Sequence, residues 1–157
     1  MNMESISICI GRKGSKGLPG KNKKIVKGNP LCFYPMDAAN KSKYVTHNFL
    51  NTDDPDLKLI GANLNHILLK RPPELANNSA LGDDVFQYSY KQVLSKFPEL
   101  ANHFVVLLFC NAPTINSKLI DDAIELLSKD KYADSVVSAS RFNMYSPLRA
   151  RKLDKKT

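Results

Sequence analysis

The sequence lacks any apolar run long enough to cross a lipid bilayer. Its first residues also lack the basic region, apolar stretch and small-residue cleavage site of a secretory signal. Cysteine is scarce: Cys9, Cys32 and Cys110 are scattered, without the spacing of a metal site or a disulfide framework. These absences predict a cytoplasmic protein in a reducing compartment, with no membrane partner.

The rest of the composition is typical of a globular domain. A chain of 157 residues can bury a sizeable core, and its 43% apolar and 24% charged residues are ordinary fractions. The formal net charge of +8 indicates an affinity for phosphate groups, as in nucleic acid, anionic lipid or a nucleotide. Much of this charge lies in one stretch without acidic residues, which contains Arg12, Lys13, Lys16, Lys21, Lys23, Lys24 and Lys27.

Strand-like and helix-like patterns alternate along nearly the whole chain. This order predicts an α/β fold: a doubly wound, mainly parallel sheet with helices on both faces and right-handed crossovers. Ligands bind at the carboxyl ends of the strands in such sheets. The expected strands are residues 5–10, 45–52, 66–70, 104–109 and 135–140, and the expected helices are residues 30–43, 56–64, 83–97 and 116–130.

Several residues have expected roles within these elements. Pro35 interrupts its helical pattern, so the regular helix there could begin at this proline. Asp53 and Asp54 fit a helix N-cap at least as well as a ligand role, and Asn116 or Ser117 can cap the last helix. Residues 104–109 are almost wholly apolar, which predicts a strand covered on both faces.

Glycine recurs at every third position from residue 11 to residue 20, directly after the first expected strand. This spacing disfavours a strand or a helix and predicts a loop whose backbone N–H groups can approach an anion. Arg12, Lys16 and Lys21 would add positive charge to the loop, and Ser15 a hydroxyl donor. The Walker and G-x-G-x-x-G motifs are absent, so this is a different phosphate loop, cationic enough to neutralise a leaving pyrophosphate.

Residues 12–22 read RKGSKGLPGKN and resemble the R-G-G-S-K-G-x-x-x-K-N signature of the acylneuraminate cytidylyltransferases (CMP-sialic acid synthetases). The resemblance extends from about residue 6 to residue 140. It implies the nucleotide-diphospho-sugar transferase type of α/β fold, Mg²⁺ as cofactor, CTP and an acidic keto-sugar as substrates, and a homodimer. Four further segments resemble family motifs in the same order: residues 28–31, 51–54, 71–76 and 133–138.

The resemblance also implies roles for individual residues. The nucleotide-binding residues would be Gly11, Arg12, Gly14, Ser15, Lys16, Lys21, Asn22, Arg71, Ser79 and Ala80. Within this set, Arg12 and Lys21 would act in catalysis by offsetting charge on the leaving pyrophosphate. Asn22 and Arg71 would hold the cytidine. Phe109 and Asn111 would lie at the sugar, and no metal ligand is identified.

The segment around residue 109 departs from the family pattern. Family members have L-L-Q-P-T-S-P-L-R there, but Phe109 replaces the glutamine near the sugar and Ile115 replaces the arginine. This difference predicts that the nucleotide end is kept and that the sugar is a different nonulosonic acid or a related keto-sugar acid. Gly82 also stands where a serine is common in the family, which weakens one nucleotide contact that the resemblance implies.

The resemblance divides the chain into two parts. Residues 1–140 would form the nucleotide-binding core, and residues 141–157 would begin an excursion that makes a dimer contact in the family. Family members then return with acidic residues that bind magnesium, but this chain ends before that segment. It is either a fragment or a naturally short protein, and in the second case the metal carboxylates would be missing.

Three alternatives to a cytidylyltransferase of a sialic-acid-like sugar stay open. One is another sugar nucleotidyltransferase of the same fold, and a second is a catalytically silent relative that only binds nucleotide. The third is a basic nucleic-acid-binding domain, which is disfavoured because no RNP-like aromatic pattern or helix-turn-helix occurs. His47, His66 and His103 flank strands and are expected to be structural or exposed, so no general base is identified.

Overall fold

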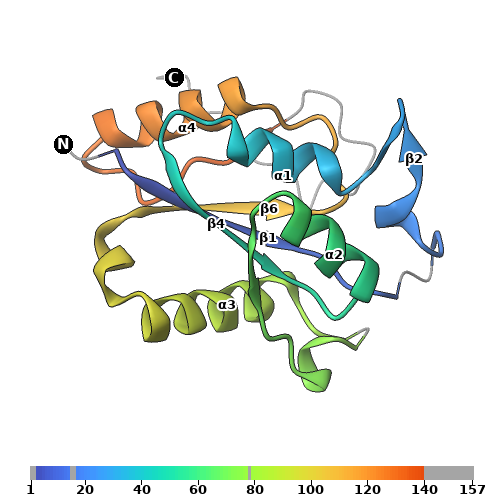
Figure 1. Ribbon diagram of the computed structural model, residues 1–157. Coiled ribbons are helices and arrows are strands. Elements are labelled where there is room, and N and C mark those ends of the chain that lie inside the picture. The colour runs from blue at the N-terminus through green and yellow to red at the C-terminus, as the bar shows by residue number, and fades with distance from the viewer. Residues whose placement is uncertain (1–2, 15–16, 78, 140–157) are drawn as a thin grey trace, which may run out of the picture.

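The computed structural model describes residues 3–14, 17–77 and 79–139 (Figure 1). Its centre is a four-stranded sheet of order β5-β4-β1-β6, in which all neighbouring strands run parallel. The strands are β1 (Ser5–Ile10), β4 (Val45–Asn51), β5 (Ile67–Leu69) and β6 (Phe104–Phe109). The α-helices are α1 (Phe33–Asn40), α2 (Pro55–Asn63), α3 (Gly82–Lys96) and α4 (Ser117–Lys129).

The sheet is covered by helices on both faces (Figure 1). Side chains alternate along the strands, so Ile8 and Cys9 enter separate hydrophobic cores. Cys9 packs in one core with apolar residues of α1, α2 and α4. Ile8 packs in the other with α3 and the 3₁₀ helix η3 (Pro98–Asn102). The predicted doubly wound α/β class is confirmed.

The helix boundaries follow from local chemistry. The Asp54 carboxylate caps α2 by accepting from Asp56 N at 2.9 Å, and the Asn116 side chain caps α4 by accepting from Leu119 N at 2.9 Å. Both predicted caps are confirmed. Pro35 is the third residue of α1 rather than its first, a position where the missing N–H still has no partner within the helix. None of the helices in the described parts of the chain is long and apolar enough to span a membrane.

One predicted feature of the sheet was wrong. Residues 135–139 form no strand, because they are mostly exposed and pair with no other described strand; residue 140 lies outside the described residues. As a result β6 is an edge of the described sheet, and of its six residues only Leu108 is buried. The side chains of β6 nevertheless pack into both cores, Val106 and Leu108 into one and Val105 and Leu107 into the other, so the strand is covered on both faces as predicted.

A small hairpin that the sequence did not indicate follows the basic loop. Strands β2 (Ile25–Val26) and β3 (Asn29–Pro30) pair antiparallel through a two-residue turn. Both turn residues have positive φ, 46° at Lys27 and 87° at Gly28. Such a turn matches the twist of a hairpin, and glycine adopts it without strain. The hairpin leads the chain from the loop into α1.

The strand order reverses direction at β1. The chain passes from β1 to β4 and β5 on one side and then returns to place β6 on the other side. In doubly wound sheets this reversal opens a crevice at the carboxyl ends of the two strands. The loops that follow β1 and β6 therefore meet at the expected ligand position.

Candidate functional site

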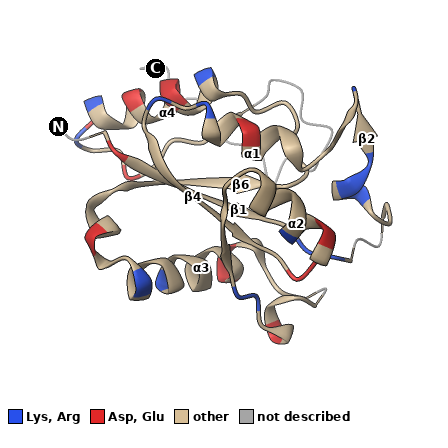
Figure 2. Cartoon of the chain, viewed as in Figure 1, with Lys and Arg blue, Asp and Glu red and all other residues tan. Residues whose placement is uncertain are grey.

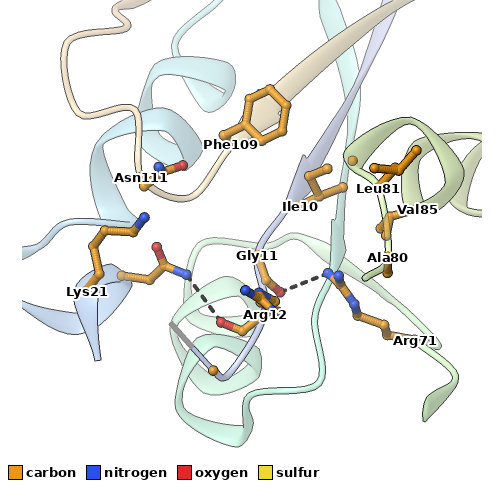
Figure 3. A pocket seen from close by; sticks show the side chains of 13 residues that line it. Ile10, Gly11, Arg12, Lys21, Arg71, Ala80, Leu81, Val85, Phe109 and Asn111 are labelled. Atoms are coloured by element: carbon orange, nitrogen blue, oxygen red, sulfur yellow. Dashed lines mark hydrogen bonds between the residues drawn. The ribbon is translucent and has the colours of Figure 1, made fainter. Parts of the chain in front are cut away.

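A cleft opens at this reversal point and is lined by residues that follow β1, β5 and β6 (Figure 3). The structure brings together nine of the twelve predicted site residues along it. Ser79 is described but does not line the cleft, and Ser15 and Lys16 lie outside the described residues. The nine are Gly11, Arg12, Gly14, Lys21, Asn22, Arg71, Ala80, Phe109 and Asn111.

Gly11 begins the loop directly after β1. Its N–H donates to the Asn51 carbonyl at 3.2 Å. A Cβ atom at this position would lie 2.5 Å from Cys110 Sγ and 3.1 Å from Leu57 Cδ2. No such contact occurs between real side chains, so the position requires glycine and the loop can pass directly over the end of β6.

Lys21 and Lys23 lie in the same short turn but make different contacts. The 3₁₀ helix η1 (Lys21–Lys23) starts after Gly20, whose φ of 66° allows the turn. Lys23 Nζ pairs with Asp54 at 3.4 Å and with Asp56 at 2.6 Å, which ties the turn to the start of α2. These carboxylates raise the pKa of Lys23, the hydrogen bond to Asp56 most of all. Lys21 lines the cleft and forms no ion pair with the described residues.

Two arginines connect the loop after β1 with the loop after β5: each lies in one loop and donates a hydrogen bond to the other. Arg12 donates from Nη1 to the Asn77 carbonyl at 2.9 Å. Arg71 donates from Nη1 to the Gly11 carbonyl at 3.3 Å and from Nε to the Leu75 carbonyl at 2.9 Å (Figure 3). Burial lowers the pKa of Arg71 from its ordinary value, but a guanidinium stays charged near neutral pH. Both cations are thus held at the cleft.

Asn77 is a site-building residue that the sequence analysis missed. Its Oδ1 accepts from Ser79 N at 2.9 Å, from Ser79 Oγ at 2.7 Å and from Ala80 N at 2.9 Å. Its Nδ2 donates to the Glu74 carbonyl at 2.8 Å. The sequence signal that could have identified it is an asparagine in a turn that follows two prolines. These bonds hold the backbone that brings Ala80 to the cleft and occupy the hydroxyl of Ser79.

One side of the cleft is apolar. Ile10 and Val85 are buried there, but Phe109 and Leu81 keep 44% and 64% of their surface exposed. The Phe109 ring lies against the start of α3, because a Cβ atom on Gly82 would be 3.6 Å from Phe109 Cε1. The ring therefore occupies a defined place at the rim (Figure 3).

The other side of the cleft is cationic. Lysine and arginine gather along the segment that leads into β2 (Figure 2), and no carboxylate is among the described residues that line the cleft. Two acids beside the basic loop are engaged: Asp53 Oδ1 accepts from Lys13 N at 2.9 Å, and Asp54 is buried at the start of α2. Such a surface favours a polyanion.

The described residues supply no protein-held metal site and no histidine at the cleft. No group of three His, Cys, Asp or Glu side chains within residues 3–14, 17–77 and 79–139 could hold a metal ion. His66 and His103 immediately precede β5 and β6, at the opposite end of the sheet from the cleft. The expected structural role of these two histidines agrees with this position.

Comparison with known proteins identifies relatives over most of the chain. It is 32% identical to an N-acylneuraminate cytidylyltransferase of Streptococcus agalactiae serotype V over 148 residues, covering 93% of this chain and 34% of that protein. It is 29% identical to N-acylneuraminate cytidylyltransferase A of Danio rerio, covering 86% of this chain and 30% of that protein. The chain thus spans about a third of the length of the curated relatives it matches.

Solved structures share the fold. A CMP:2-keto-3-deoxy-manno-octonic acid synthetase complexed with CTP superimposes with a TM-score of 0.64 at 19% identity, covering 82% of this chain and 49% of that one. A cytidylyltransferase from Leptospira borgpetersenii gives a TM-score of 0.60 at 17% identity, covering 84% and 51%.

The sequence profile of one family extends over nearly the whole chain. The family is described as cytidylyltransferase, and residues 6–155 match it. The resemblance found in the basic loop is therefore confirmed by comparisons that use the full sequence. The chain belongs to the cytidylyltransferase family.

Proposed function

We propose that the protein activates an acidic keto-sugar of the nonulosonic type with CTP, giving a CMP-sugar and pyrophosphate. The observation that carries the proposal is the cleft between the ends of β1 and β6, where Arg12, Lys21 and Arg71 line the same cavity as Phe109. Family membership supports a cytidine nucleotide, and the N-acylneuraminate relatives support the class of acid.

In the proposed reaction the anomeric hydroxyl oxygen of the acid attacks the α-phosphorus of CTP. The bond from the α-phosphorus to the oxygen that bridges to the β-phosphorus breaks, and its electron pair leaves with pyrophosphate. The hydroxyl proton is released to solvent. Negative charge therefore builds on the leaving group, and Lys21 and Arg12 would stabilise it. Positioning and charge stabilisation are the main contributions of proteins to phosphoryl transfer.

The remaining cleft residues would bind the two substrates. Arg71 is already fixed by its hydrogen bonds to the Gly11 and Leu75 carbonyls, so it could meet the cytidine without further ordering. Asn22 would bind on the nucleotide side, together with the backbone around Ala80. Asn111, beside Lys21 in the cleft, would contact the sugar acid (Figure 3).

Mg²⁺ is the proposed cofactor, on the basis of the family resemblance alone. The described residues do not provide a cage for it, and protein sites for nucleotide-bound Mg²⁺ often contribute only one or two carboxylates. When bound to the phosphates it would neutralise part of their charge. The roles given to Lys21, Arg12 and Arg71 do not depend on it.

The resemblance also supports two proposals about the protein in the cell. We propose that it acts as a homodimer and that it is located in the cytoplasm. The segment expected to begin the dimer contact, residues 141–157, lies outside the described residues. Size-exclusion chromatography with light scattering on the full-length protein would test the first proposal, and a single-chain mass would contradict it.

Pyrophosphate release tests the activity. The full-length protein would be mixed with Mg²⁺, each nucleoside triphosphate in turn, and a panel of nonulosonic acids. We expect release only when CTP and one class of acid are both present. Release with another triphosphate would indicate a different sugar nucleotidyltransferase, and CTP binding without release from any acid would indicate a catalytically silent relative.

A further inference from the structure

The chain between β5 and Arg71 is held by a side chain of α3. β5 ends at Leu69 and is an edge of the described sheet, so no strand among the described residues pairs with its outer side. The next residue, Lys70, donates from its backbone N to Gln92 Oε1 at 3.1 Å, and Gln92 Nε2 donates to the Lys70 carbonyl at 2.8 Å. A hydrogen-bonded residue of an antiparallel strand makes the same pair of bonds. Gln92 thus takes the place of a neighbouring strand at this one residue.

The Lys70 carbonyl also belongs to a closed set of bonds at the strand ends. Asn51, the last residue of β4, is fully buried, and its Nδ2 donates to the Lys70 carbonyl at 3.5 Å. The Asn51 carbonyl accepts from Gly11 N at 3.2 Å, and the Gly11 carbonyl accepts from Arg71 Nη1 at 3.3 Å. Because Lys70 and Arg71 are consecutive, these bonds close a circuit through the ends of β1, β4 and β5. Gln92 connects this circuit to α3.

Proline restricts the backbone on the other side of Arg71. Arg71 precedes Pro72, and the residue before a proline is confined to extended conformations. The 3₁₀ helix η2 (Pro73–Leu75) follows, and the carbonyl of its last residue accepts from Arg71 Nε at 2.9 Å. The direction in which the Arg71 side chain leaves the strand therefore depends on the peptide group before it, whose carbonyl Gln92 holds.

We propose that Gln92 is a positioning residue for nucleotide binding: it fixes the peptide group between Lys70 and Arg71 and so directs the Arg71 guanidinium into the cleft. This inference rests on the proposed function, since it uses the cytidine contact given there to Arg71. Gln92 is not among the described residues that line the cleft, so its effect on the nucleotide is exerted through Arg71. An arginine that is held before the nucleotide arrives loses less side-chain freedom on binding, which favours affinity.

A double-mutant cycle on CTP affinity tests the proposal. Gln92→Met keeps the length of the side chain and removes both bonds to Lys70. We expect it to lower the affinity of the full-length protein for CTP by about 3- to 10-fold, the effect of about one net hydrogen bond, in a calorimetric titration. In the Arg71→Ala background the same substitution should change the affinity by less than about twofold, because the guanidinium that Gln92 directs is gone. The stoichiometry of each titration reports the folded fraction, so partial unfolding of a variant is not mistaken for weaker binding.

Gln87→Met is the matched control, because Gln87 is an exposed glutamine of the same helix. It should bind CTP within about twofold of the wild type. The inference is overturned if Gln92→Met binds CTP as tightly as the wild type, or if it lowers the affinity equally with and without Arg71, since equal losses would indicate a general loosening. Unchanged CTP affinity in Arg71→Ala would contradict the role of Arg71 and overturn the inference with it. A failure of the proposed activity is distinct, because pyrophosphate release would then be absent while CTP binding and the cycle could still be measured.

Discussion

Lys21 differs from the other lysines of the basic run in what its ammonium group can do. Lys23 is occupied by Asp54 and Asp56, whereas Lys21 lines the cleft without an ion pair among the described residues. We expect Lys21→Ala to lower the turnover of CTP by about 10²-fold or more, the loss typical of one donor to a developing charge. Lys24→Ala is the control, because Lys24 is exposed outside the cleft. Equal turnover in the two variants, measured by pyrophosphate release, would contradict the role of Lys21.

Gly11 is a second residue whose identity has a specific physical reason. A Cβ atom there would meet Cys110 at 2.5 Å, so Gly11→Ala should destabilise the protein by about 1–3 kcal/mol through overpacking. Gly14→Ala should change stability by less than about 0.5 kcal/mol, since no atom lies within 4 Å of the added Cβ. Urea unfolding followed by circular dichroism suits a chain without tryptophan. If Gly11→Ala lowers the free energy of unfolding no more than Gly14→Ala does, the loop accommodates the added Cβ atom without cost, which would contradict the steric requirement at Gly11.

His66 gives the stability a dependence on pH. Burial lowers its pKa from 6.5, and its buried Nε2 has no hydrogen-bond partner among the described residues. The unfolded chain therefore binds a proton at a higher pH than the folded chain does. Stability is unaffected by this group above pH 6.5 and falls as the pH drops below that value, until the folded-state pKa is reached. The loss is about 1.4 kcal/mol for each unit of pKa depression.

Urea titrations between pH 8 and pH 5 measure this effect. In His66→Leu, which cannot take up the proton, the decline just below pH 6.5 should be shallower than in the wild type. Because only the slope is compared, a general loss of stability in the variant does not affect the test. Equal slopes in the two proteins would assign the decline to other groups.

Residue positions at the cleft were predictable where the reason is local, and not where it depends on distant contacts. Spaced glycines and lysines indicated the loop after β1, and Arg71 was recognisable at the end of a strand before two prolines. The steric requirement at Gly11 arises from Cys110, which directly follows β6, and the bond from Arg12 to the Asn77 carbonyl depends on how two loops meet. Neither contact can be inferred from the neighbouring sequence.

At the scale of elements, the loops after β1 and β5 form one unit that Asn77 organises. Asn77→Ala removes three accepted hydrogen bonds and one donated bond, so the segment that carries Ala80 should loosen. We expect the affinity for CTP to fall about 5- to 30-fold, given about 0.5–1.5 kcal/mol for a typical hydrogen bond and incomplete loss of the set. Calorimetric titration of CTP measures the change.

Two further variants separate positioning from general stability. Asn77→Asp retains the acceptor for Ser79 and Ala80 and should recover most of the CTP affinity. Ser79→Ala removes a single bond and should have an effect of about threefold or less. If Asn77→Ala lowers the unfolding midpoint but leaves CTP affinity intact, Asn77 is structural only.

Most helices and strands were predictable because the apolar positions in their sequences match the positions that are buried. The strand 104–109 and the two capped helices have the expected bounds to within a residue, since apolar periodicity and N-cap residues act locally. The β2–β3 hairpin was missed because its strands have two residues each, too few for any periodicity. Residues 135–140 were expected to be a strand from their sequence, but pairing also requires a partner, and the described part contains none.

At the scale of the whole molecule, the parallel sheet explains why distant segments meet. Its order places the loop after β1 between the segments that follow β5 and β6, so one cleft collects cationic and apolar side chains far apart in sequence. The alternation of strands and helices predicted the fold class and the edge of the sheet that would carry the site. It did not predict which face of the cleft is apolar, because that follows from the packing of Phe109 on the start of α3.

The most direct test of the account follows the phosphorus atoms of CTP. The full-length protein would be incubated with Mg²⁺, the accepted acid, and CTP labelled at the α-phosphorus, and the products would be separated. The account predicts that all transferred label appears in a CMP-sugar and that unlabelled pyrophosphate forms in equal amount. Label that stays in CDP or free CMP, with no sugar nucleotide formed, would show cleavage without transfer to the acid and would contradict the proposed activity.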